Sequence, residues 1–256
     1  VFQDPYYTKQ FPEQAVKRKD NGAVWKDRKG LSFIDAGSQK AWDYVIRIGK
    51  ESYSRGFDEI NYYYIRFPSD GDMSNTAYTF ADGRTKAEVI RDFFAYVHSK
   101  FENTGIVISA DLFGMTTSNT DDLGIGQVLE NALPYFDFID PMVYPSHYPA
   151  TWNGFANPAD HPYEVVKIAM SKGLEREQAL KLSMGLATST PSKLRSWIQD
   201  FSLGATYDAS KVRAQIQAVY DAGLDSWMLW DPANIYTKEI LEKNIPRLPV
   251  VEKLTE

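Results

Sequence analysis

Carboxylates follow apolar segments at several points of this 256-residue chain, where strands would end. Asp111 closes the apolar run of IVISADLFG, and Asp231 follows Trp230 in SWMLWDPANIY. A buried strand gains nothing from a carboxylate at its end unless the group is hydrogen-bonded or functional. Two carboxyl groups that flank a glycosidic bond are what its hydrolysis requires. Asp111 is therefore a catalytic candidate, with a helix cap or loop anchor as the alternative, and Asp231 is a candidate partner.

The segment 57–66 carries polar residues at the spacing of a strand. Period-two alternation puts Glu59, Asn61 and Tyr63 on one face, which we expect to point into the interior of a barrel. The opposite face suits a layer of helices and holds Ile60, Tyr62 and Tyr64. Glu59 and Tyr63 therefore join Asp111 and Asp231 as candidates for the chemistry.

Five residues near strand ends are candidates for substrate binding: Arg66, Tyr144, His147, Asp200 and Trp230. Arg66 could orient a carboxylate through a bidentate pair and lower its pKa, or it could form a structural ion pair. Tyr144 and His147 lie in a loop with two prolines, in PMVYPSHYP. Trp230 is the preferred sugar platform, because the C–H faces of sugars stack on aromatic rings. Asp140, earlier in its strand, is either a polar core residue or part of the site.

Three helix-glycine-strand units position these residues. A helix over 39–55 ends at Gly56, a second opens with the capping box of Thr85 and Glu88 and ends at Gly105, and a third is capped by Asp208 and ends at Gly223. A strand follows each glycine, which is typical of right-handed βα units. In such folds the carboxyl ends of parallel strands meet at one face. We therefore expect Asp111, Arg66, Tyr144, His147 and Trp230 to share a rim.

The chain shows six strands, counting Val1–Phe2, with five helices between them, including helices over 122–134 and 162–172. A closed barrel needs eight strands. We predict an α/β fold, a single TIM-type (β/α)8 barrel domain over 1–256 that lacks its first two βα units. An open six-stranded sheet is the alternative. Six strands leave two edges, so self-association through exposed sheet edges is expected.

Composition excludes several classes of function. The net charge of −6 and the absence of a basic run argue against nucleic-acid binding. The chain has no cysteine, hence no disulfide or thiolate site, and no apolar stretch near the ~20 residues of a membrane span. No ligand spacing typical of metal sites occurs, so we predict no catalytic metal and no cofactor. The start at Val1, without a signal peptide, suggests an excised piece of a longer protein.

Nearly the whole chain resembles a bacterial family of glycosyl hydrolase domains related to the α-amylase-like barrels. The strings that carry the resemblance are VFQDP, GAVWKDRKG, FDEI with YIRFP, SADLFG, DDLGIGQ, PMVYPSHY, WIQDF and SWMLWDPANIY. The resemblance implies an (α/β)8 barrel in which VFQDP ends the third strand. It also implies glycosidase activity on a polysaccharide, with an extracytoplasmic or cell-surface location expected.

One position departs from the family. Where the family's fourth strand carries an inward-facing Asp, this chain has Tyr63, in the neighbourhood of the nucleophile of related barrels. We therefore expect a glycoside hydrolase that uses Asp111 with Glu59, Asp200 or Asp231 and that Tyr63 impairs. The alternative is a non-catalytic carbohydrate-binding barrel. A hydrolase of esters or amides is a third possibility, but no G-x-S-x-G motif supports it.

Overall fold

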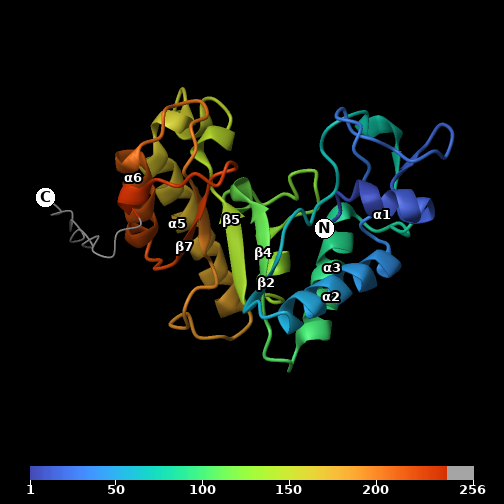
Figure 1. Ribbon diagram of the computed structural model, residues 1–256. Helices are drawn as coiled ribbons and strands as arrows, with labels where there is room; N and C mark the ends of the chain where they lie inside the picture. The colour runs from blue at the N-terminus through green and yellow to red at the C-terminus, as the bar shows by residue number, and fades with distance from the viewer. Residues whose placement is uncertain (241–256) are drawn as a thin grey trace, which may run out of the picture. The chain divides into compact units, whose positions relative to one another are not determined.

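A computed structural model describes residues 1–240 of the chain (Figure 1). The strands β2, β4, β5, β6 and β7 follow one another in a single sheet, and the pairs β2–β4, β5–β6 and β6–β7 are parallel. Helices connect successive strands, so the α/β prediction with parallel βα units is confirmed. The described part contains five of the eight strands of a closed barrel. The chain divides into two compact units, unit 1 (1–112 and 119–139) and unit 2 (113–118 and 140 onward).

Unit 1 contains the N-terminal helices and the first strands of the sheet. Its elements are α1 (Pro5–Gln10), η1 (Pro12–Gln14), β1 (Lys17–Arg18), α2 (Gln39–Ser54), β2 (Glu59–Tyr62), η2 (Met73–Asn75), β3 (Thr76–Ala77), α3 (Lys86–Phe101), β4 (Val107–Phe113) and α4 (Leu129–Ala132). β1 and β3 form a separate antiparallel ribbon. In the main sheet, Asn61 of β2 lies opposite Ser109 of β4.

Local sequence signals explain where α2 and α3 begin. Ser38 caps α2 by accepting a hydrogen bond from the backbone N–H of Ala41. Thr85 and Glu88 form the expected capping box of α3. Each box or cap satisfies amide groups that the first turn of a helix leaves without a partner.

The inner faces of the helices pack on β2 much as predicted. Phe93 of α3 meets Tyr62 edge to face, with 6.3 Å between ring centroids, which confirms that Tyr62 faces the helix layer. Trp42 of α2 is also buried. The helical spacing of the sequence predicts Ile48 and Tyr53 on the same face of α2 as Trp42, but they are exposed by 46% and 39%. Ile48 lines an open groove described below.

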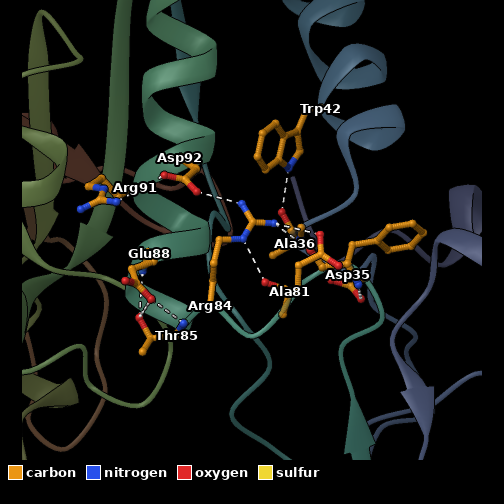
Figure 2. A network of polar contacts seen from close by, with 12 residues as sticks. Asp35, Ala36, Trp42, Ala81, Arg84, Thr85, Glu88, Arg91 and Asp92 are labelled. Atoms are coloured by element: carbon orange, nitrogen blue, oxygen red, sulfur yellow. Dashed lines mark hydrogen bonds and ion pairs between the residues drawn. The ribbon is translucent and has the colours of Figure 1, made fainter.

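A polar network fixes the segment that leads into α3 (Figure 2). The guanidinium of Arg84 binds Asp92 of α3 at 2.8 Å and donates to the carbonyls of Phe80 and Ala81. The buried Asp35 accepts from the backbone N–H groups of Gly37 and Phe80, both at 3.1 Å. Burial nevertheless raises the pKa of Asp35, because desolvation outweighs these bonds. The network ties residues 78–84 to the start of α2 and to α3.

Unit 2 contains the last strands and the two longest C-terminal helices. Its elements are β5 (Phe138–Met142, which begins in unit 1), η4 (Pro145–His147), η5 (Trp152–Gly154), η6 (Pro158–Asp160), α5 (Pro162–Ser183), β6 (Ser196–Gln199), α6 (Ala209–Asp221), β7 (Trp227–Trp230) and η7 (Lys238–Ile240). α5 packs against α6. Asp208 caps α6 by accepting from the N–H of Lys211 at 3.0 Å, as predicted. Gln199 of β6 lies opposite Trp230 of β7, so these strand ends are level.

Several element boundaries differ from the prediction. The predicted helix over 122–134 shrinks to α4, because Asp122 caps a turn in which Leu123 has φ of +52°. α5 continues to Ser183, well beyond the predicted end at residue 172. Val1–Phe2 is not a strand of the sheet, although the N–H of Phe2 donates to the carbonyl of Tyr64 at 3.1 Å.

Candidate active site

In unit 1, four polar residues within the neighbouring strands β2 and β4 form a hydrogen-bonded chain, which we call the acidic cluster: Glu59, Asn61, Ser109 and Asp111. Ser109 Oγ donates to Glu59 Oε1 at 2.5 Å. Asn61 Nδ2 donates to Ser109 Oγ and to Asp111 Oδ1, each at 3.0 Å. Ser109 is fully buried and Asp111 is 5% exposed, whereas Asn61 is open to solvent. Glu59 and Asn61 share a partner and therefore a face, as the alternation predicted.

Ser109 was missed at the sequence level. It stands two residues before Asp111, and this spacing in a strand puts both side chains on one face. The same period-two argument that grouped Glu59 with Asn61 would have found it.

The strand alternation stops beyond Tyr62, and Tyr64 does not join the helix layer as predicted. Tyr64 has φ of +61°, a conformation that is rare for a bulky residue. Its ring packs against Phe33, 6.1 Å away, in the small core formed with Val16 and Trp25. Backbone strain of this kind is found most often at functional sites, where the surroundings enforce it.

Arg66 is held by its neighbours just beyond this turn. Its Nη2 donates to the hydroxyl of Tyr64 at 2.7 Å, and its guanidinium lies 4.3 Å from the centre of the Tyr64 ring. Nη1 donates to the carbonyl of Phe67 and to Ser69 Oγ. Arg66 is 8% exposed, and burial lowers its pKa. Its position is therefore built into the turn that follows β2.

Tyr63 lies within the electrostatic influence of Asp111. Its side chain is 51% exposed, and its pKa is raised by partial burial, by Tyr64 and by the negative charge of Asp111, while Arg66 acts in the opposite direction. A phenol with a raised pKa is neutral at physiological pH. Tyr63 therefore presents an uncharged hydroxyl within the electrostatic influence of Asp111.

An open groove with a volume of about 420 Å³ runs beside β2 in unit 1. Its walls include the apolar side chains of Tyr44, Ile48 and Phe57 and the polar residues Glu59 and Asn61. Two members of the acidic cluster are thus accessible from this groove.

In unit 2, Tyr144, His147 and Phe201 form a cluster of rings. Their centroids are 5.4 to 6.0 Å apart and the contacts are edge to face. Ser146 lies 3.1 Å from His147 Nδ1, and both its N–H and its Oγ donate to Gln199 Oε1. Desolvation lowers the pKa of His147, which keeps the imidazole neutral at pH 7.

Asp200 and Asp231 bind the loops that follow their strands. Asp231 Oδ1 accepts from the N–H groups of Ala233 at 2.6 Å and Ile235 at 3.2 Å. Asp200 accepts from the N–H and the hydroxyl of Thr237, at 2.7 and 2.6 Å. Both carboxylates are buried, with 5% and 7% of their surface exposed. These contacts are those of loop anchors.

Two other features complete the strand ends of unit 2. Trp230 is 39% exposed and meets Trp197 edge to face, with 5.9 Å between centroids. Asp140 is fully buried and receives two hydrogen bonds from Arg195, at 3.1 and 3.0 Å. Arg195 was not singled out at the sequence level. Asp140 is thus half of a bidentate ion pair.

The sequence-predicted residues therefore fall into two sets. Glu59, Tyr63, Arg66 and Asp111 belong to unit 1, and Tyr144, His147, Asp200, Trp230 and Asp231 belong to unit 2. A rim shared by both sets remains a prediction. Within residues 1–240, no group of three His, Asp or Glu side chains is arranged to hold a metal ion. No helix of this described part is long and apolar enough to cross a membrane.

The family described as "Putative glycosyl hydrolase domain" matches residues 1–236. The chain belongs to this family. The resemblance seen in the sequence is thereby confirmed, and a carbohydrate is the substrate class that family membership implies. No curated protein is significantly similar to this sequence.

Three solved structures illustrate what the domain is similar to. A hypothetical protein from Ruminiclostridium thermocellum ATCC 27405 shares 35% identity over 48% of this chain and 56% of its own, with a TM-score of 0.39. The glycoside hydrolase domain of PgaB (BpsB) from Bordetella bronchiseptica shares 16% identity over 57% of this chain and 37% of its own, with a TM-score of 0.41. The glycoside hydrolase domain of PelA from Pseudomonas aeruginosa shares 10% identity over 91% of this chain and 75% of its own, with a TM-score of 0.48. The domain spans about half the length of the first of these proteins.

Proposed function

We propose that the domain acts on a polysaccharide as a glycoside hydrolase, with Asp111 and Glu59 of the acidic cluster as its pair of carboxylates. The observation that supports this most strongly is the hydrogen-bonded chain of polar side chains across β2 and β4. It holds two carboxylates on one face, next to solvent. The family to which the chain belongs favours the same chemistry.

The geometry of the pair is compatible with hydrolysis. Three hydrogen bonds of 2.5, 3.0 and 3.0 Å link Glu59 Oε1 to Asp111 Oδ1, so these oxygens are at most about 8.5 Å apart. Retaining enzymes need a separation of about 5–5.5 Å and inverting enzymes about 6.5–9.5 Å. The upper limit admits either outcome. In both, one carboxyl group protonates the leaving oxygen and the other acts as nucleophile or base.

Asp200 and Asp231 are weaker candidates for the second carboxylate. Their oxygens bind backbone N–H groups of the following loops, and a reaction at these groups would give up that anchoring. Exposed aromatic side chains suit sugar binding better: Trp230 offers a partly exposed ring, and His147 lies at the surface beside Tyr144. We assign substrate binding in unit 2 to Trp230 and His147, whereas Tyr144, predicted to bind substrate, is only 8% exposed and supports the ring of His147.

Tyr63 supports a second candidate function, a domain that binds glycans without cleaving them. A neutral phenol beside Asp111 cannot take the part of a carboxylate nucleophile. Phenols do serve as nucleophiles in sialidases, but a nearby base is needed there. The proposed hydrolase is therefore impaired by Tyr63, and in the limiting case only binding survives.

A glycan array followed by product analysis on the same hits tests both functions. Hydrolysis that is lost in Asp111→Asn supports the proposal. Binding without cleavage supports the second candidate. Neither binding nor cleavage on any glycan contradicts both.

A further inference from the structure

Asn61 is the member of the acidic cluster that connects its two ends. Its side-chain amide donates to Ser109 Oγ and to Asp111 Oδ1, both at 3.0 Å. A primary amide has two N–H bonds in one rigid plane. The two acceptors therefore fix both the position and the rotation of this amide.

Ser109 determines the orientation of the side-chain amide of Asn61. A hydroxyl has a single hydrogen, and Ser109 directs it to Glu59 Oε1 at 2.5 Å. The hydroxyl oxygen of Ser109 can therefore only accept a hydrogen bond from Asn61. The NH₂ group of Asn61 must face Ser109, because its carbonyl oxygen would meet a second acceptor there. Ser109 is fully buried, so no water competes for this arrangement.

We infer that Asn61 is a positioning residue for Asp111 and that Ser109 and Glu59 set its orientation. This inference rests on the proposed function, since orientation matters only where Asp111 contacts a substrate. Donation by Asn61 holds Oδ1 in one direction and favours the ionised carboxylate over the protonated form. Reversal of the amide would present its carbonyl oxygen to Asp111 and repel it. The hydrogen bonds thus run outward from Asn61, to Asp111 on one side and through Ser109 to Glu59 on the other.

The test follows the ionisation of Asp111 itself, so it does not depend on turnover. The side-chain carboxyl of Asp111 is titrated by ¹³C NMR in the unmodified protein and in Asn61→Leu, Ser109→Ala and Asn75→Leu. Asn75 is the matched control, because its amide donates to another carboxylate of unit 1, Asp20, at 3.0 Å. Amide shifts of β2 and β4 report whether the strands remain paired.

Asn61→Leu is expected to move the Asp111 titration upward by about one pH unit, since a bond to a charged group is lost. Ser109→Ala should produce a smaller upward shift, because the amide is no longer locked. Asn75→Leu should leave Asp111 unchanged and move the titration of Asp20 upward instead. An Asp111 titration that stays in place in both Asn61→Leu and Ser109→Ala, with the strands paired, overturns the inference.

Turnover then separates this inference from the proposed function. If a substrate is cleaved, Asn61→Leu should lower kcat more than it raises KM, because binding groups are untouched. If Asn61→Leu leaves the Asp111 titration unchanged and hydrolysis is normal, the positioning role of Asn61 is overturned and the proposed hydrolase function stands. A clear titration shift without hydrolysis of any glycan keeps the positioning role of Asn61 and overturns the catalytic role of the cluster.

Discussion

Carboxylates follow strands in both units of this domain, but their partners differ. In unit 1, Asp111 receives a hydrogen bond from a side chain, Asn61, which is itself linked to Glu59 through Ser109. In unit 2, Asp231 and Asp200 accept bonds from the backbone of the loops that follow. The first arrangement links polar side chains of two strands, and the second closes a loop.

This difference in hydrogen-bond partners shows that the position of a carboxylate near the end of a strand does not by itself determine its role. A side-chain partner can be replaced or moved without disturbing the main chain, so the carboxylate remains available to a ligand. A backbone partner ties the carboxylate to the fold, and its loss leaves buried N–H groups unsatisfied. Substitutions in the two units should therefore separate activity from stability.

The largest effect is expected at Tyr63. Tyr63→Asp should raise hydrolysis by orders of magnitude, because it replaces a neutral phenol, within the electrostatic influence of Asp111, with an additional carboxylate directly after the end of β2. Initial rates of glycan hydrolysis provide the measurement.

Tyr63→Phe is the matched control for this change. It removes the hydroxyl but adds no charge, so its rate should equal that of the unmodified protein. Equal rates for the unmodified protein and for Tyr63→Asp would exclude position 63 from the chemistry and leave Glu59 as the proposed partner of Asp111.

The next largest effect is expected for the ion pair of unit 2. Asp140→Asn leaves the charge of Arg195, which is only 14% exposed, without its bidentate partner. Loss of one member of a buried pair costs about 3–5 kcal/mol of unfolding free energy. Urea denaturation measures this loss. Adding Arg195→Gln should recover part of it, and a double variant as unstable as Asp140→Asn alone would contradict the role of the charge.

The comparison of the two units is sharpest between Asp231→Asn and Asp111→Asn. Asp231→Asn should lower the free energy of unfolding by about 1.5–3 kcal/mol, because two loop N–H groups lose a charged acceptor. Asp111→Asn should abolish hydrolysis with a smaller change in stability. Thermal denaturation and rate measurements on both variants are needed. A loss of activity in Asp231→Asn at full stability would move the second carboxylate to unit 2.

Elements with local signals at both ends could be predicted from the sequence. α3 and α6 begin at the predicted capping side chains and α6 ends just before Gly223, since these signals act within one turn, whereas α3 ends at Phe101, four residues before the predicted Gly105. The length of α5 could not be predicted in this way. The helix continues through Gly173, where Leu194 and Thr117 pack close to the backbone. An added Cβ would lie 3.2 Å from Leu194 and 3.3 Å from Thr117. Tertiary packing, rather than helix termination, explains this glycine.

The site shows the same limit. Period-two alternation placed Glu59 and Asn61 correctly, because it depends only on strand geometry. It failed at Tyr64, where a positive φ turns the ring toward Phe33. Arg195 could not be paired with Asp140 from the sequence, since the two residues meet only when β5 and β6 align.

The smallest effect concerns pH and the ring cluster of unit 2. Desolvation lowers the pKa of His147 below its ordinary value of about 6.5, so the unfolded chain binds this proton at a higher pH than the folded protein does. The folded protein therefore has its full stability with respect to His147 above about pH 6.5. This stability decreases as the pH falls from about 6.5 toward the lowered pKa.

His147→Gln should reduce the loss of stability over that acidic range and change nothing at pH 8. The difference is expected to be small, because the side chain lies at the surface, where water screens the charge. His161→Gln is the control, because it removes an imidazole of unit 2 that lies outside this ring cluster, 4.0 Å from Glu164. Thermal denaturation of the three proteins between pH 5 and pH 8 decides the matter. If His147→Gln retains the full acid sensitivity, the ring cluster does not desolvate His147, and its assignment to sugar binding loses the apolar surface on which it rests.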